Sequence, residues 1–203
     1  MTIVRYTLLA DGSSDAALMP IIDWLINQHR PDLNVQGQFA EHLGDVGRTL
    51  PDRLSMALQR YPCELFFVHR DAENAPHLAR LEEIVNAAGI QHPNLVPVIP
   101  GRMTEAWLLS DESAIRAAAG NRHGKTPLNL PPKRQWDSLP DPKAELVAAL
   151  KAASEKTGRA LSKFHPLQCR HLVAARTANF SDLRGIGAFD RFEQDLVNAL
   201  REF

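Results

Sequence analysis

The sequence has few cysteines and no long hydrophobic run. Cys63 and Cys169 are the only two cysteines in 203 residues, and they lie far apart. They form neither a disulfide framework nor the paired spacing of a thiolate metal site. No apolar run approaches the roughly 20 residues that a membrane span needs. The first residues also lack a basic segment followed by a long apolar stretch. We therefore expect no secretory signal, no membrane partner and a cytoplasmic location.

Three common catalytic motifs are also missing. The sequence has no Gly-x-x-x-x-Gly-Lys-Ser/Thr phosphate loop, so we expect no intrinsic ATPase activity. It has no Gly-x-Ser-x-Gly nucleophile elbow. A dinucleotide-binding fingerprint is absent too, because the Gly-Ile-Gly stretch at 185–187 follows no strand-like segment.

The charge balance is uneven along the chain. The net charge is −1, but residues 1–114 carry 8 basic and 15 acidic side chains, whereas residues 115–203 carry 15 basic and 9 acidic ones. One interpretation is an acidic metal cleft beside a polyanion-binding surface. The other is that the two halves attract each other or spread their charge over solvent. The sequence leaves both open.

The hydrophobic pattern predicts alternating strands and helices. Apolar runs at 3–10, 33–40, 64–68 and 94–99 are typical of strands. The segments between them have helical periodicity: one runs from a turn at 12–14 to about residue 29, and two others span 46–60 and 76–88. In the first of these helices, Pro20 predicts a bend or a late start. This order predicts an α/β fold with a Rossmann-like, open, mostly parallel sheet of about four strands flanked by helices.

The second half of the chain changes character. A helix is expected from residue 104 to about 119, and residues 120–142 then hold five prolines among basic side chains. Helical patterns follow at 143–156, 166–176 and 188–202. We therefore divide the chain into an α/β core at 1–119, a proline-rich basic loop at 120–142, and a helical C-terminal extension at 143–203 that packs on the core.

Carboxylates gather where two predicted strands end. Asp11 and Asp15 follow the first strand, and Asp71 and Glu73 follow the third. Ligands of open parallel sheets bind outside the carboxyl ends of the strands. Four acids brought together there repel each other and need a cation. We expect a hard divalent ion, Mg²⁺ or Mn²⁺, held best by Asp71 and Glu73. Asp11 is a further ligand or the general base, and Asp15 either completes the site or only stabilises the start of its helix.

The order and spacing of these acids resemble the Toprim domain shared by topoisomerases, primases and overcoming-lysogenization-defect nucleases. The resemblance covers roughly residues 3–100. The segments RMTEAWLLSD at 102–111 and NFSDLRGIGAFDRF at 179–192 look like a little-characterised bacterial family of Toprim-like proteins that are suspected of roles in phage defence. The resemblance implies a magnesium-dependent nuclease that acts on DNA or RNA and that has a separate ATPase as a possible partner.

Two positions depart from the Toprim pattern. Asp11 stands where that family has Glu, and Glu73 completes an Asp-x-Glu pair where the family has Asp-x-Asp. Asp is one methylene shorter than Glu, so proton transfer would need a rearranged site or an intervening water. A catalytically weak binding or regulatory subunit is therefore one alternative. A metal-dependent phosphohydrolase acting on small phosphoesters is another.

Further residues are candidates for the site. Glu105 opens a helix, where an acid also suits the helix dipole, and the resemblance favours a catalytic role for it. Arg70 could stabilise charge in a transition state or form an ordinary salt bridge. His69 is expected to be a packed, hydrogen-bonded side chain; the alternative is that it supports a metal ligand or shuttles a proton. Trp136 either stacks on a base or fills a gap in the packing.

The expected nucleic-acid contacts come from basic side chains after the fourth strand and in the proline-rich loop: Arg102, Arg122, Lys125, Lys133 and Arg134. Binding of a polyanion through such residues would weaken as the salt concentration rises.

Overall fold

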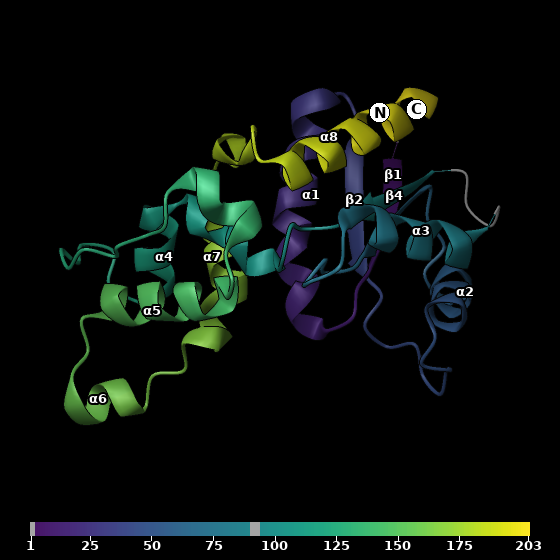
Figure 1. Cartoon of the computed structure of the whole chain (residues 1–203). Helices are drawn as coiled ribbons and strands as arrows, with labels where there is room; N and C mark the ends of the chain where they lie inside the picture. Colours follow the sequence, from purple (N-terminus) through teal and green to yellow (C-terminus); the bar gives the residue numbers. More distant parts are fainter. Residues whose placement is uncertain (1–2, 90–93) are drawn as a thin grey trace.

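A four-stranded parallel sheet forms the centre of the N-terminal half (Figure 1). The structure is a computed structural model and describes residues 3–89 and 94–203. The strands are β1 (Ile3–Leu9), β2 (Asn34–Phe39), β3 (Leu65–His69) and β4 (Leu95–Val98), in the order β2-β1-β3-β4. Tyr6 of β1 pairs with Gly37 on one side and Leu65 on the other. The predicted α/β class and open parallel sheet are confirmed.

The burial of each strand follows its place in the sheet. All five residues of β3 are buried, and β1 is buried from Tyr6 onward. The outer strands β2 and β4 are only partly buried, and β4 carries Pro97, a residue that edge strands tolerate. The central strands therefore end inside the molecule, and their packing holds the backbone of the residues at their carboxyl ends in place.

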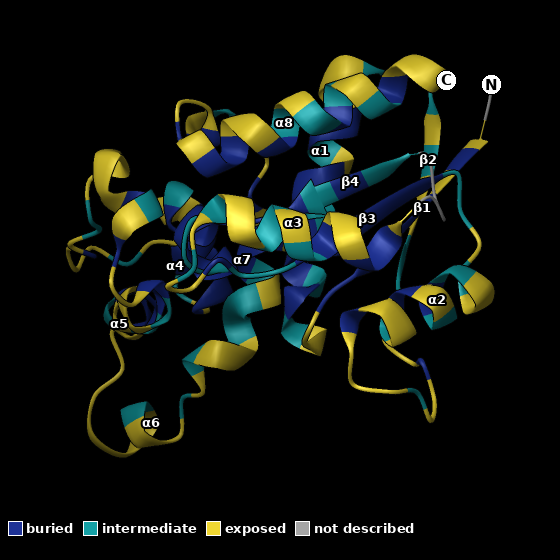
Figure 2. Cartoon of the chain, turned by 45° about the vertical axis from the view of Figure 1, so that its right-hand side comes forward, coloured by how far each residue is buried: buried dark blue, intermediate teal, exposed yellow. Residues whose placement is uncertain are grey.

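Helices cover both faces of the sheet (Figure 2). The helices α1 (Met19–His29) and α8 (Gly187–Ala199) share one hydrophobic cluster with Tyr6, Leu8 and Phe67. The helices α2 (Leu50–Arg60) and α3 (His77–Ala88) pack on the other face against Phe66 and Val68. Alternate residues of β3 thus point into different layers, as a pleated strand requires.

Some helix boundaries differ from the predicted ones. The segment after β1 begins as a 3₁₀ helix, η1 (Ser13–Leu18), and the α-helix starts late, with Pro20 in its first turn. The helix predicted from residue 46 begins at Leu50, because the Thr49 side chain accepts a hydrogen bond from the Asp52 backbone N–H and caps it. The predicted end of α3 is confirmed: Gly89 follows it with a φ of +53°.

The single helix expected from residue 104 to 119 is two elements. A 3₁₀ helix, η2 (Thr104–Ser110), is followed by α4 (Glu112–Ala118). The break falls at Asp111, whose carboxylate accepts a hydrogen bond from the Ala114 backbone N–H and so starts a new helix.

The C-terminal half is helical. The proline-rich loop contains the 3₁₀ helix η3 (Lys133–Ser138), and α5 (Pro142–Ser154) and α6 (Gly158–Ser162) follow. Next come η4 (Pro166–Cys169), α7 (Arg170–Arg176), η5 (Ser181–Leu183) and, after α8, η6 (Leu200–Glu202). The helices α4, α5 and α7 pack together beside the sheet, and α8 returns across it (Figure 1).

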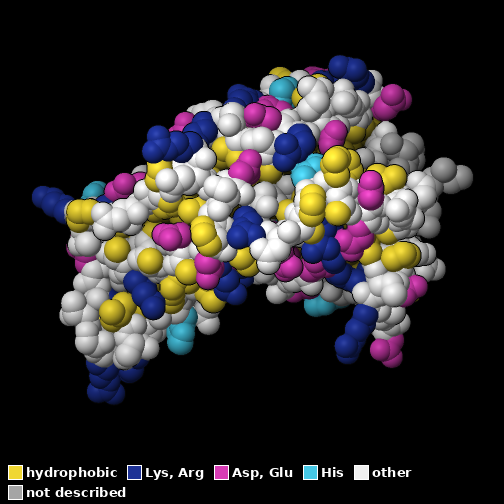
Figure 3. Space-filling view, in the orientation of Figure 1, with side chains coloured by type: hydrophobic (Ala, Val, Ile, Leu, Met, Phe, Trp, Pro, Cys, Tyr) yellow, Lys and Arg dark blue, Asp and Glu magenta, His cyan; other side chains and the backbone are white. Residues whose placement is uncertain are grey.

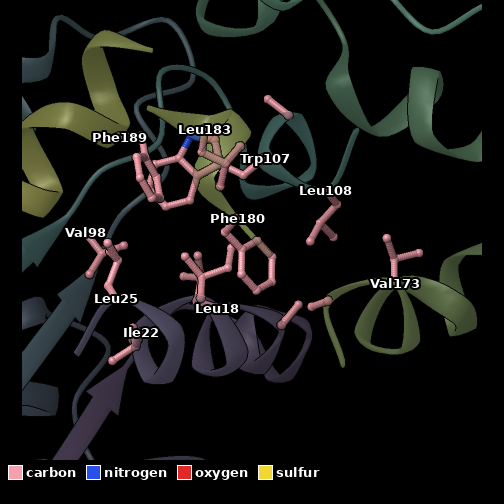
Figure 4. Close-up of a cluster of buried hydrophobic side chains, with 14 of the residues drawn as sticks. Leu18, Ile22, Leu25, Val98, Trp107, Leu108, Val173, Phe180, Leu183 and Phe189 are labelled. Carbon is pink, nitrogen blue, oxygen red and sulfur yellow. The ribbon is translucent and has the colours of Figure 1, made fainter. Parts of the chain in front are cut away.

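One hydrophobic cluster joins the two halves (Figure 4). The Phe192 ring of α8 lies 6.1 Å from the Phe67 ring of β3 and is stacked 5.9 Å from Trp107 of η2. Leu18 from the N-terminal half and Val173 and Phe180 from the C-terminal half belong to the same cluster. The helical half is therefore anchored on the sheet face that α1 also covers.

Across the described ranges, 3–89 and 94–203, no helix is long and apolar enough to cross a membrane.

Candidate functional site

The candidate site lies where β3 ends and where η1, η2 and α7 meet. Beyond β3 the chain stays hydrogen-bonded to its neighbour: the backbone N–H of Arg70 donates to Val98, and that of Ala72 to Pro100. The helix α7 packs on both η1 and η2. Three acidic side chains lie near one another here, Asp15 from η1, Asp71 after β3 and Glu105 from η2, and we call them the acidic cluster.

Asp15 is held by the turn that precedes its own helix. Its Oδ2 accepts a hydrogen bond of 3.0 Å from the Gly12 backbone N–H, and the side chain is mostly buried. This is the helix-start role that the sequence allowed. The same Oδ2 lies 3.9 Å from Nε2 of His69, so Asp15 also faces the acidic cluster. The two roles are compatible in one side chain.

His69 is the last residue of β3, and its side chain is almost fully buried. Its Nδ1 lies 2.9 Å from the Val98 carbonyl oxygen. A carbonyl only accepts hydrogen bonds, so Nδ1 carries a proton. Nε2 is thereby turned toward the acidic cluster, 3.4 Å from Oδ1 of Asp71 and 3.4 Å from Oγ1 of Thr104. The expected packed, hydrogen-bonded histidine is confirmed, and it lies directly against the carboxylates.

Asp71 is the most strongly perturbed carboxyl of the cluster. Its Oδ1 accepts a hydrogen bond of 3.1 Å from the Thr104 backbone N–H. Burial is the main reason that the pKa of Asp71 is raised from 3.8 to about 6; His69 opposes the rise, and the negative charges of Asp15 and Glu105 add smaller contributions to it. A bound cation would favour the charged form of Asp71 and offset the repulsion from these two neighbours.

Glu105 is buried, with 2% of its side chain exposed, and forms an ion pair with Arg170 of α7. A buried carboxylate needs such a partner to remain charged. Arg170 comes from the helical half, so this ion pair connects α7 to the end of the sheet. In this structure Arg170 supplies the positive charge next to Glu105.

Asp11 is separated from the acidic cluster by its own partners. Its carboxylate accepts hydrogen bonds of 2.7 Å from Arg53 and 2.9 Å from Arg70. Arg70 also lies 2.9 Å from Glu83 of α3. We call Arg53 and Arg70 the edge arginines. The salt bridge that was one of the two roles considered for Arg70 is present, and Asp11 faces these two cations.

Glu73 lies outside the acidic cluster. Its side chain is 66% exposed and stands 3.7 Å from Arg80 of α3. The backbone at Glu73 has a φ of +51°, which turns the chain away from the direction of β3. Glu73 instead lines a small pocket of about 210 Å³ together with Asn74, Arg102, Met103 and Pro140. The structure thus brings Asp71 to Asp15 and Glu105, but does not bring Glu73 to them.

The predicted basic contacts fall into two groups. Arg102 donates hydrogen bonds to the carbonyls of Glu73 and Leu139 and to the Asn74 side chain, and so holds the loop after β3. Lys133 donates to the Arg184 carbonyl. Arg122, Lys125 and Arg134 are exposed. On the face shown in Figure 3, Lys and Arg side chains alternate with acidic ones over both halves of the molecule.

Trp136 fills a gap in the packing. It is buried, and its indole N–H donates a hydrogen bond of 2.9 Å to the Pro131 carbonyl. Base stacking, the other role considered for Trp136, would need an exposed ring.

An oxygen-rich donor set suits a hard divalent ion, and the acidic cluster provides one. Among the described residues, however, no three His, Cys, Asp or Glu side chains are already arranged to hold a metal ion. The donor chemistry of these carboxylates fits Mg²⁺ or Mn²⁺. Binding would require these carboxylates to draw together.

Two residues of the site, Arg53 and Arg170, were not singled out by the sequence. No sequence signal points to them, since they lie 42 residues from Asp11 and 65 residues from Glu105. His69 was already a candidate, and its spacing from Asp71 agrees with that, because side chains two apart share a face of a strand. Comparisons of the chain with protein-family models, with curated proteins and with solved structures found no match.

Proposed function

We propose that the chain is a divalent-metal-dependent, Toprim-like nuclease that cleaves nucleic-acid phosphodiesters at the acidic cluster. The observation that supports this most is Asp71 itself. It lies at the carboxyl end of a central strand, next to Asp15 and Glu105, and its pKa is raised to about 6. Strongly perturbed carboxyls at this edge of an open sheet are typical of functional sites.

Each group of residues has a role in this proposal. Asp15 and Asp71 would hold the ion, and Glu105, fixed by Arg170, adds negative charge beside them. A bound divalent ion would polarise the phosphodiester and lower the pKa of a bound water. The edge arginines, Arg53 and Arg70, would contact the phosphate backbone beside the cluster, with Asp11 keeping them in place.

Partners follow from the same proposal. The substrate is DNA or RNA, held through the edge arginines and the exposed basic residues of the helical half, which include Arg122, Lys125 and Arg134. Because the sequence has no phosphate loop, any ATP-dependent control would come from a separate ATPase. A role in phage defence is part of the proposal through the resemblance alone.

A specific observation favours a second candidate, a catalytically weak regulatory subunit. Asp11 is neutralised by two arginines, Glu105 by a third, and no three donors of the described chain converge on one point. A protein that kept the fold for binding would tolerate such pairing. This candidate predicts tight binding of a partner without cleavage.

The test is incubation of the purified chain with plasmid DNA, single-stranded DNA, RNA and mononucleotides. Each reaction contains Mg²⁺, Mn²⁺ or EDTA, and the Asp71→Ala variant is run beside the wild type after its fold has been checked by circular dichroism. Metal-dependent cleavage of a polynucleotide that disappears in the variant supports the nuclease. Hydrolysis of mononucleotides alone would indicate a small-phosphoester hydrolase, and no reaction would favour the regulatory subunit.

A further inference from the structure

The acidic cluster contains one nitrogen donor, Nε2 of His69, whose surroundings differ from those of a histidine that only fills space. The side chain is 1% exposed, and it projects from the end of a central strand into a group of carboxylates. An imidazole buried for packing alone would be expected among apolar neighbours. His69 instead has Asp15, Asp71 and Thr104 around Nε2.

The other ring nitrogen of His69, Nδ1, already has a hydrogen-bond partner. Nδ1–H donates to the Val98 carbonyl at 2.9 Å, which fixes both the tautomer and the orientation of the ring. Histidines that bind metals almost always donate their second ring N–H in this way, to a backbone carbonyl or a carboxylate. Metal ions bind the neutral form of the ring, and with the proton on Nδ1 the lone pair of that form is on Nε2, directed at the acidic cluster.

The distances at Nε2 are close to those within one coordination shell. Donors about 2.1 Å from a common octahedral ion lie about 3.0 Å apart when adjacent and about 4.2 Å apart when opposite. Nε2 lies 3.4 Å from Oδ1 of Asp71 and 3.9 Å from Oδ2 of Asp15. The first separation lies near the adjacent spacing and the second near the opposite one, so a small movement of each carboxylate would bring it to a common ion with Nε2.

We propose that Nε2 of His69 is a ligand of a divalent ion shared with Asp71 and Asp15, and that the site consequently selects Mn²⁺ over Mg²⁺. The inference rests on the proposed function for the place of the ion, but not on the cleavage reaction. Mg²⁺ takes oxygen ligands and sheds its water reluctantly, whereas a mixed set of imidazole and carboxylates suits a transition metal. Glu73, which the sequence placed in the ligand set, is replaced in this assignment by His69.

The test measures binding of Mn²⁺ and of Mg²⁺ alone, by calorimetry, to the wild type and to two variants. His69→Asp replaces the nitrogen with oxygen and keeps a ligand, and we expect it to lower the ratio of Mn²⁺ to Mg²⁺ affinity at least about tenfold. His42→Gln removes a histidine whose side chain is 86% exposed, and we expect it to leave the ratio unchanged. Thermal melting of each variant shows that the fold is retained.

A spectroscopic readout separates ligation from a mere structural effect. Electron spin-echo measurements on the Mn²⁺-loaded wild type should show coupling to an imidazole nitrogen, and the coupling should be lost in His69→Asp and kept in His42→Gln. Mn²⁺ bound without that coupling, or an unchanged affinity ratio in His69→Asp, would overturn the inference while leaving a metal-dependent nuclease possible. No binding of either ion would overturn both the inference and the proposed function. Nitrogen ligation without cleavage would support the inference and contradict the nuclease alone.

Discussion

Arg170 and Glu105 form a buried ion pair that joins the helical half of the chain to the end of the sheet. The two residues are 65 positions apart, and the Glu105 side chain is almost completely removed from solvent. Because the charge of Glu105 contributes to the raised pKa of Asp71, the ion pair also affects the electrostatics of the acidic cluster.

Removing Arg170 should therefore be costly. We expect Arg170→Gln to lower the free energy of unfolding by about 3–5 kcal/mol, because it leaves the Glu105 carboxylate buried without a partner. The double variant with Glu105→Gln should recover much of that loss. The measurement is urea unfolding at neutral pH. As a matched control, Arg5→Gln breaks the exposed pair with Glu64 and should cost far less than the loss of the buried pair. An equal, small loss in both single variants would contradict a buried ion pair.

The raised pKa of Asp71 predicts a pH dependence of stability. With a pKa of about 6 in the folded chain against 3.8 when unperturbed, Asp71 binds its proton more tightly in the fold. Its contribution thus favours the folded state below pH 4 and is lost as the pH rises toward 6. In EDTA at pH 7, we expect Asp71→Asn to unfold at a higher urea concentration than the wild type. The free energy of unfolding should rise by an amount on the order of 3 kcal/mol at most.

The pH profile supplies its own control. The difference between wild type and Asp71→Asn should shrink or reverse at pH 4, where the wild-type carboxyl is protonated in the folded state and partly protonated in the unfolded state. Mn²⁺ or Mg²⁺ at pH 7 should stabilise the wild type and leave the variant unaffected, because a ligand that binds only the folded state stabilises it. A difference that stays constant between pH 4 and pH 7 would show that Asp71 has an ordinary pKa.

The edge arginines predict opposite effects of two substitutions on polyanion binding. Arg70→Gln should weaken binding of single-stranded DNA and reduce the slope of log affinity against log salt by about 0.7, the contribution of one phosphate contact. Asp11→Asn should strengthen binding, because it removes the carboxylate that now pairs with Arg53 and Arg70.

Fluorescence anisotropy at several salt concentrations, in EDTA so that no cleavage intervenes, measures both effects. Arg201→Gln removes the same charge from an exposed position at the far end of the chain and serves as the control. Should Arg70→Gln and Arg201→Gln change the salt slope equally, the edge arginines would have no special contact with the nucleic acid.

Much of the fold could be predicted because its strongest signals are local. Residues 65–68 form an uninterrupted apolar run in the buried strand β3, and the end of α3 at Gly89 follows from the residue type. The start of α2 and the break before α4 were missed because each depends on one capping side chain, Thr49 and Asp111. Whether a side chain caps a helix depends on the local backbone angles. The helical pattern of the sequence continues through both capping residues, so it does not show where the helix begins.

The site could be predicted only in part, for a related reason. Asp15 and Asp71 were found because parallel strands end at a common edge, which brings their following residues together. Glu73 was placed in the same group, but the left-handed backbone at that residue turns its side chain outward, and only the folded loop reveals this. Arg170 reaches Glu105 through tertiary packing of α7 on η2, for which no spacing rule exists.

The most direct test of the central claim is to compare Asp71→Asn with Glu73→Gln in metal-dependent cleavage of the best polynucleotide substrate. Both changes remove one negative charge near the end of β3, but only Asp71 belongs to the acidic cluster. We predict that Asp71→Asn loses more than about 100-fold in cleavage rate, beyond the 10–100-fold usual for residues that only support a metal ligand, and that Glu73→Gln stays close to wild type. Equal losses in both variants, or cleavage by Asp71→Asn at the wild-type rate, would contradict the account.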